Sequence, residues 1–251
     1  MATKYPHHIF FRLSFVILLL AVVSALAGVS AGLGTRLGLW AFGTGFTILR
    51  FAAYGGLVAA LSSLIMLLAG FALRAPASTF AVTTLALLIG GTAFYVPLSL
   101  WREARRLPVI HDITTDTDDP PQFKAVLPLR RNVQNPSEYG GEQVALKQRL
   151  AYPDIKPLIL PGDADAAFDK ALGAAKGLGW EIVDADKGQG RIEATDTTLW
   201  FGFKDDIVVR ITPLGQGSAR IDVRSVSRVG RSDIGKNAQR VRKYLGLLSR
   251  G

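Results

Sequence analysis

The side chains whose types could bind a metal or transfer a proton gather in a short polar stretch, residues 108–121. A histidine beside carboxylates can hold a divalent cation or act as an acid–base pair. This stretch has a single imidazole and lacks the glycine and terminal glutamate of a calcium loop, so a solvated loop with an Asx turn is favoured over a metal site. A hydrolase that uses these groups is kept as an alternative function. The residues concerned are His111, Asp112, Asp116, Asp118 and Asp119.

A second candidate is the stretch Gly230–Asn237, which is similar to a phosphate-binding loop. It matches the pattern G-x-x-x-x-G-K-[ST] except at Asn237, which stands where Ser or Thr is required. An asparagine cannot supply the hydroxyl that usually binds magnesium, and the preceding segment alternates in charge, unlike a buried parallel strand. A helix N-cap at Ser232 explains the stretch better, so nucleotide binding is the less favoured alternative.

Arginines on two expected strands, 199–212 and 219–228, form the third candidate. Apolar residues alternate along these strands, so the arginines share the opposite face of the sheet with acids. Solvated Arg/Asp pairs are the favoured interpretation, and a row of guanidinium groups that binds lipid phosphates is the functional alternative. The proposed binding residues are Arg210, Arg220, Arg224 and Arg228, with His111 and Asp112. No cofactor and no metal site are expected.

The net charge of +9 is distributed unevenly along the 251 residues. Most of the excess lies in residues 1–107, where arginines flank apolar stretches and Glu103 is the acid present. Residues 220–251 are also basic, which suggests an acidic partner surface, either external or supplied by the chain's own acidic stretch. The high pI therefore reports membrane-flanking arginines, and nucleic acid is not expected as a partner. The chain has no cysteine, which excludes disulfides, thiolate metal sites and cysteine nucleophiles.

Three uncharged stretches, each bounded by arginines, are long enough to cross the ~30 Å hydrocarbon core of a membrane as helices. A shorter apolar interval with three aromatic residues is better explained as an interfacial or re-entrant segment. The spans are predicted at 13–35, 51–73 and 76–101, and the interfacial segment at 37–49.

The orientation of the spans rests on two conflicting signals. Lys4 and Arg12 before the first span are typical of an N-terminus that stays in the cytoplasm, whether or not this span is cleaved as a signal sequence. Three spans then place the C-terminal domain in the periplasm. The larger group of arginines, however, falls on that same side, which the positive-inside rule disfavours. A periplasmic domain is preferred, in a multi-pass protein of the bacterial inner membrane.

The C-terminal part carries the signals of an α+β domain. Asp163 or Asp165 can cap a helix that ends at Gly177 or Gly179, and four strand patterns and a closing amphipathic helix follow. The predicted fold is a two-layer sandwich: an antiparallel sheet of about four to five strands with two helices on one face. The predicted organisation is a transmembrane region at 1–107, an extended acidic and proline-rich connection at 108–157 with a short helix from Glu142 to Leu150, and the α+β domain at 158–251.

Several stretches in the same order resemble one protein family. They are PVIHDITTDTDDPPQF, YPDIKPL, WEIVDAD with GRIEATDTTLWFGFKDDIVVRI, and SARIDVRSVSRVGRSDIGKNAQRVRKYL. They resemble the bacterial and plastid family called domain of unknown function 1499, over about residues 108–249. Because members of that family are often exported, lipid-anchored or lumenal, the resemblance implies an exocytoplasmic domain. It implies no activity.

The sequence thus predicts a non-enzymatic membrane protein that presents a small α+β domain at the membrane surface. The expected partners are membrane lipids and an acidic protein or anionic lipid headgroup. The hydrolase and the nucleotide-binding domain are the alternatives.

Overall fold

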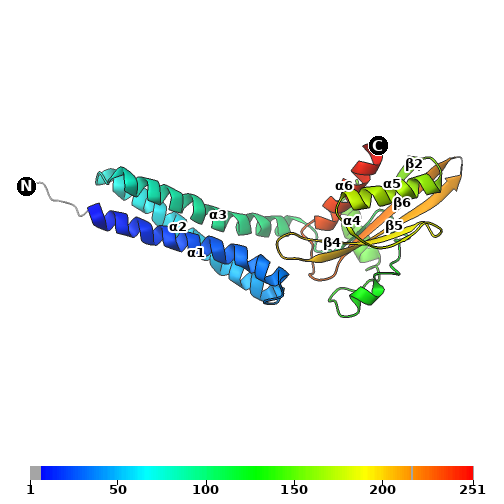
Figure 1. The fold of residues 1–251 in the computed structure, drawn as a ribbon, viewed down its shortest axis with the longest axis horizontal. Helices are drawn as coiled ribbons and strands as arrows, with labels where there is room; N and C mark the ends of the chain where they lie inside the picture. The colour runs from blue at the N-terminus through cyan, green and yellow to red at the C-terminus, as the bar shows by residue number, and fades with distance from the viewer. Residues whose placement is uncertain (1–6, 216, 251) are drawn as a thin grey trace, which may run out of the picture. The chain divides into compact units, whose positions relative to one another are not determined.

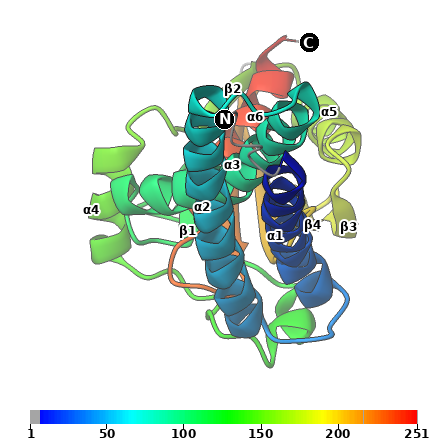
Figure 2. The same cartoon turned by 90° about the vertical axis from the view of Figure 1, so that its left-hand side faces the viewer.

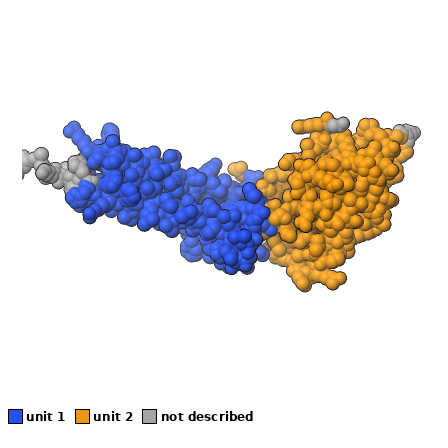
Figure 3. Space-filling view, viewed as in Figure 1, with its two compact units in different colours: residues 1–103, 199–202 blue, residues 104–198, 203–251 orange. Residues whose placement is uncertain are grey.

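The computed structural model describes residues 7–215 and 217–250. The chain divides into two compact units, which are treated separately below (Figure 3). The first comprises the residues up to Glu103 with Leu199–Gly202, and the second comprises Ala104–Thr198 and the residues from Phe203 onward. Lys4, which entered the orientation argument, lies outside the described residues.

Three helices make up most of the first unit: α1 (His7–Arg36), α2 (Phe42–Ala72) and α3 (Ala77–Arg106). All three are long and apolar enough to cross a membrane, which confirms the predicted number of candidate spans. The helix α2 begins at Phe42, so most of the segment expected to be interfacial, 37–49, forms the first turns of this helix.

Small residues let these helices approach closely. The buried positions of α2 and α3 recur at alternating spacings of three and four, as in a left-handed helix pair. A Cβ atom added at Gly56 would lie 2.7 Å from the carbonyl oxygen of Gly90, too close for any side chain. The backbones of α2 and α3 are therefore in direct contact at these two glycines.

The second unit contains a six-stranded antiparallel sheet of order β1-β6-β5-β4-β3, with β2 also paired to β6. Figure 1 labels the strands β2, β4, β5 and β6, and Figure 2 labels β1 and β3. The predicted α+β architecture is confirmed, and the strands beyond the predicted meander are the short β1 and β2. The bounds are β1 Asp112–Thr114, β2 Leu158–Pro161, β3 Glu181–Asp186, β4 Arg191–Thr197, β5 Lys204–Gly215 and β6 Ser218–Ser227.

Two helices, α5 (Ala164–Gly177) and α6 (Lys236–Arg250), cover one face of this sheet. Asp163 caps α5 by accepting the Ala166 N–H at 2.7 Å, as predicted. The indole of Trp180 stacks on the Tyr244 ring of α6, with ring centroids 4.9 Å apart. The core between the helices and the sheet is built from alternate strand residues such as Ile207, Val209 and Ile221.

The predicted cap of the closing helix was wrong. The helix α6 begins at Lys236, not after Ser232, because Ile234 and Gly235 both have positive φ angles, 51° and 73°, which no α-helix accommodates. The carboxylate of Asp233 binds the amides at the helix start instead, accepting the N–H groups of Gly235 at 2.9 Å and Asn237 at 2.6 Å.

The other face of the sheet, here called the outer face, is covered by residues 115–141, here called the strap (Figure 1). The strap has one short 3-10 helix, η1 (Leu127–Arg130), and packs Phe123 and Val126 on Val208 and Val226. The region expected to be an extended connection with a short helix, 108–157, contains that helix as α4, and it also contains β1 and η1.

The helix α4 (Glu142–Ala151) closes the edge of the sheet at β1. The buried side-chain amide of Gln148 donates to the Thr114 carbonyl at 2.5 Å and accepts the Thr114 N–H at 2.9 Å. One side chain therefore satisfies both backbone groups that another strand would otherwise bind.

Candidate functional site

The outer face is centred on a buried ion pair between Arg224 of β6 and Asp112 of β1. Nε and one terminal nitrogen of Arg224 donate to the two carboxylate oxygens at 3.0 and 2.7 Å. The other donors of Arg224 bind the carbonyls of Pro121 and Ser137, at 3.2 and 2.8 Å. Its side chain is fully buried. Burial raises the pKa of Asp112, and the hydrogen bonds from Arg224 oppose that shift.

Two aromatic rings enclose this guanidinium group. Its central carbon lies 5.2 Å from the centroid of the Phe123 ring and 5.4 Å from that of the Tyr139 ring. Both rings belong to the strap, so the strap holds Arg224 through carbonyl and cation–π contacts. Arg224 is a structural anchor that a ligand does not reach.

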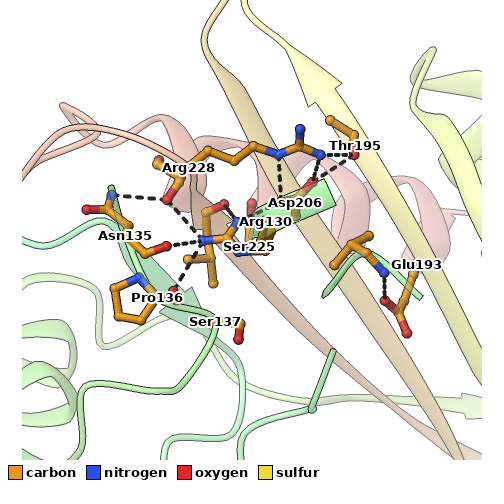
Figure 4. Close-up of polar contacts among 12 residues, drawn as sticks. Arg130, Asn135, Pro136, Ser137, Glu193, Thr195, Asp206, Ser225 and Arg228 are labelled. Carbon is orange, nitrogen blue, oxygen red and sulfur yellow. Dashed lines mark hydrogen bonds and ion pairs between the residues drawn. The ribbon is translucent and has the colours of Figure 1, made fainter. Parts of the chain in front are cut away.

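In a second group, two arginines bind the same carboxylate (Figure 4). Asp206 of β5 accepts hydrogen bonds from Arg130 of the strap at 2.6 Å and from Arg228 at 2.8 and 2.9 Å. The Thr195 hydroxyl donates to the same carboxylate at 2.7 Å. Burial alone would raise the pKa of Asp206, but the bonds from Arg228, Thr195 and Arg130 outweigh it and lower the pKa.

These arginines belong to a larger cationic region where two loops meet. The N–H of Asn135 donates to the Arg228 carbonyl at 3.0 Å, and its side chain donates to the Gly230 carbonyl at 2.8 Å. Loops 130–135 and 228–231 are thereby held side by side. They carry four arginines, here called the arginine corner: Arg130, Arg131, Arg228 and Arg231.

The charge of the arginine corner is not balanced. Asp206 is the carboxylate that Arg130 and Arg228 share. Arg131 and Arg231 are exposed, and no ion pair to either is formed by residues 7–215 and 217–250. Two positive charges are therefore open to solvent beside a buried group with a net charge of +1.

A third group joins β5, β6 and the strap. Arg210 contacts Asp116, Asp119 and Asp222, with nitrogen–oxygen distances of 3.2, 2.7 and 3.1 Å. Arg220 contacts Asp116 at 2.6 Å and Asp222 at 3.0 Å. Asp116 and Asp119 of the strap therefore supply carboxylate partners to Arg210 and Arg220.

A buried carboxylate also holds the start of η1. Glu193 of β4 accepts the N–H groups of Lys124, Ala125 and Val126 at 2.9 to 3.0 Å; Figure 4 draws one of these bonds. Arg191 lies 3.0 Å from the same carboxylate. Glu193 therefore fixes the strap to the sheet through backbone amides.

The structure brings most of the predicted site residues together. Arg210, Arg220, Arg224 and Arg228 all lie on the outer face, and each is paired with an aspartate. The favoured prediction of a solvated face was wrong at its centre, where the strap buries Arg224 and Asp112.

His111, the candidate acid–base residue, takes part in hydrogen bonds through its backbone carbonyl. Its carbonyl accepts the Ser227 N–H and the Asn237 side-chain amide, both at 3.0 Å. In the part of the chain that the structure describes, no group of three or more His, Cys, Asp or Glu side chains is placed to hold a metal ion. The aspartates that a hydrolase would need are bound by arginines, since Asp112 pairs with Arg224 and Asp116 with Arg210.

The loop that is similar to a phosphate-binding loop already contains an anion. Its amides at Gly235 and Asn237 bind the carboxylate of Asp233. The Asn237 side chain is buried and accepts a hydrogen bond from Ser225 at 2.7 Å. The amides that would surround a phosphate are therefore occupied, and the stretch serves as a helix entry.

Sequence reasoning missed Arg130 and Arg131, because the strap has no periodic pattern that predicts which of its residues face the sheet. It also missed Gln148, whose role depends on the position of a three-residue strand. The consecutive basic pair Arg130-Arg131 was the signal that could have indicated the arginine corner.

Comparison with known proteins agrees with the resemblance carried by the sequence stretches. No curated protein matches the chain. The model of the family described as protein of unknown function (DUF1499) matches residues 112–248, which include the whole sheet, the strap and all but the last residues of α6. The chain therefore belongs to the DUF1499 family and joins its domain to three helices that could span a membrane.

Proposed function

We propose that this chain is a multi-pass protein of the bacterial inner membrane whose periplasmic domain binds anionic lipid headgroups without catalysing a reaction. The observation that carries this proposal is the charge imbalance of the arginine corner, where Arg130 and Arg228 share one carboxylate and Arg131 and Arg231 are exposed. Guanidinium groups bind phosphate oxygens in a forked geometry, which suits lipid headgroups.

The length of the tether favours lipid over a distant partner. Residues 107–111 are all that separates the end of α3 from the start of β1. A chain of this length reaches at most about 18 Å when fully extended. The domain is thereby confined near the headgroups, at which each basic residue contributes about 1 kcal/mol to binding.

The outer face supports a binding role over an enzymatic one. Its carboxylates are held by arginines or by backbone amides, as Asp112, Asp206 and Glu193 show. A carboxylate held in this way is a structural acceptor and not a base poised for proton transfer.

We expect the arginine corner to carry the lipid affinity. The full chain, in phosphatidylcholine nanodiscs, would be mixed with vesicles of phosphatidylcholine alone or with added phosphatidylglycerol, and co-flotation measured. Because Arg131 and Arg231 are exposed, Arg131→Gln/Arg231→Gln should fold normally and bind the anionic vesicles about 10- to 30-fold more weakly. The matched control is Lys147→Gln/Lys176→Gln, which removes the same charge at exposed helix positions.

Equal losses in both variants would reject the arginine corner as the site. A wild-type chain that does not distinguish the two vesicles would reject lipid as the ligand and leave an acidic protein as the candidate.

The orientation can be tested by cysteine labelling, because the chain has no cysteine of its own. We expect a membrane-impermeant maleimide to label Lys176→Cys, an exposed position on α5, from the periplasmic side of intact cells. Arg74→Cys, at an exposed position between the predicted spans 51–73 and 76–101, should stay unlabelled because the proposed orientation places it in the cytoplasm. The opposite labelling pattern would show that the domain is cytoplasmic.

A further inference from the structure

The turn formed by Asp116, Asp118 and Asp119 lies among three arginines from three different elements. Asp116 contacts Arg210 of β5 and Arg220 of β6, and Asp119 contacts Arg210. The third carboxylate, Asp118, lies 3.7 Å from Arg149 of α4. All three carboxylates of one short turn thus face cations from outside the turn.

These ion pairs differ from the buried ones in their access to solvent. The side chains of Arg149, Arg210 and Arg220 are 43%, 28% and 34% exposed, whereas those of Arg224 and Arg130 are 0% and 3% exposed. Partly exposed ion pairs contribute little to stability, because water and salt screen them. Of the carboxylates of the turn, Asp118 and Asp119 are 92% and 79% exposed, whereas Asp116 is 13% exposed. The arginines are therefore reachable from solvent at this turn, and an anion that binds them must displace Asp116 and Asp119 while the buried pairs keep the strap in place.

The charges that remain without the turn define a site. Arg210 and Arg220 both stay bound to Asp222, whose side chain is 1% exposed. Two guanidinium groups then face one carboxylate, so the group has a net charge of +1. Arg210 and Arg220 direct their outer N–H groups to the place that Asp116 and Asp119 leave.

We propose that this turn is an internal occupant of an oxyanion site built by Arg210 and Arg220, and that a phosphate dianion or phosphomonoester displaces it. A tetrahedral phosphate presents several oxygens to converging guanidinium forks, as the two carboxylates do together. The site shares no residue with the arginine corner, so the inference does not depend on the proposed lipid-binding role of the corner. Phosphate cannot bind while the turn occupies the site. The apparent affinity for phosphate is therefore reduced in proportion to the fraction of time that the turn is bound.

The test removes the charge of the internal occupant and keeps its shape. Asp116→Asn/Asp119→Asn retains side chains that can form the Asx turn. By calorimetric titration of the full chain in detergent, this variant should bind inorganic phosphate about tenfold more tightly than the wild type, a difference of about 1.4 kcal/mol. The gain should disappear when Arg210→Gln/Arg220→Gln is added.

Two controls separate this effect from a general change in charge or fold. Glu138→Gln/Glu181→Gln raises the net charge equally at exposed positions and should give no gain. Asp119→Asn alone, at a side chain that is 79% exposed, should fold normally and give a smaller gain in the same direction. Arg131→Gln/Arg231→Gln should leave the gain intact, so the two proposals can fail independently.

Vesicles with phosphatidic acid distinguish a lipid phosphomonoester from free phosphate. Binding of these vesicles but not of inorganic phosphate by the Asn variant would identify a lipid source, and binding of inorganic phosphate would show that the free ion suffices. Failure to bind either, an equal gain in the charge control, or a gain that survives loss of Arg210 and Arg220 would overturn the inference.

Discussion

Replacing Arg224 with methionine is expected to lower the free energy of unfolding of the C-terminal domain by about 3–5 kcal/mol. The substitution leaves the Asp112 carboxylate buried without its cation and removes donors from the carbonyls of Pro121 and Ser137. The lost ion pair also removes the interactions that oppose the burial of Asp112, so the pKa of this carboxyl should rise further. Urea denaturation of the full chain in detergent would measure the change.

Arg242→Met is the matched control for this prediction. Arg242 also makes a two-bond contact with Asp154, which at 2.6 and 2.7 Å is at least as short, but both side chains are about half exposed. Its loss should cost less than about 1 kcal/mol. Similar losses for the two variants would show that burial of Arg224 is unimportant. Adding Asp112→Leu to Arg224→Met should restore part of the stability, because the lone buried charge is removed.

Replacing Asp206 with asparagine is expected to destabilise the domain by about 3–5 kcal/mol at neutral pH. The variant leaves Arg130 and Arg228 facing each other across a neutral amide, in the buried layer between the strap and the sheet. A loss well below this range would show that water and salt already screen the charges of the two arginines.

The effect of this substitution should depend on pH in a defined direction. The pKa of Asp206 is lower in the folded state than its ordinary value, so its ionised form contributes stability above the unfolded pKa of about 3.9. That contribution disappears as the pH falls through the folded pKa, so wild type and Asp206→Asn should become more alike in acid.

Asp233 provides the opposite case. Burial raises its pKa, although the N–H groups of Asn237 and Gly235 oppose the shift. Its stabilising contribution is complete below the unfolded pKa and is lost as the pH rises through the folded pKa. The free energy of unfolding, measured by urea denaturation between neutral pH and pH ~3, should therefore change with pH in opposite directions for Asp206→Asn and Asp233→Asn, each relative to the wild type. A change in the same direction for both variants would contradict the opposite pKa shifts of Asp206 and Asp233.

The elements with a regular pattern were predictable. Uninterrupted apolar stretches identified three helices, and alternation along β5 and β6 identified the core face of the sheet. The cap at Asp163 followed from local chemistry, because its hydrogen bond spans three residues. Such features depend on neighbours in the sequence.

Whether the outer face is buried or exposed to solvent was not predictable from a regular pattern. A strand that alternates Arg and Asp has the same pattern whether water or a strap covers it, so Arg224 and Arg220 were indistinguishable. What buries Arg224 is a segment about a hundred residues away that has no periodicity. The start of α6 was misplaced for a related reason, since the positive φ of Ile234 has no sequence signature.

The amide of Gln148 has a consequence for the behaviour of the domain in a crowded cell compartment. An open strand edge invites pairing with strands of other molecules, which leads to aggregation. Here a helix closes that edge at Thr114 through one side chain, whereas the opposite edge, β3, carries Glu181, Asp184 and Asp186, whose charges repel an incoming strand. Partial unfolding of α4 would therefore expose β1 as a template for intermolecular strand exchange, even while the rest of the sheet remained folded.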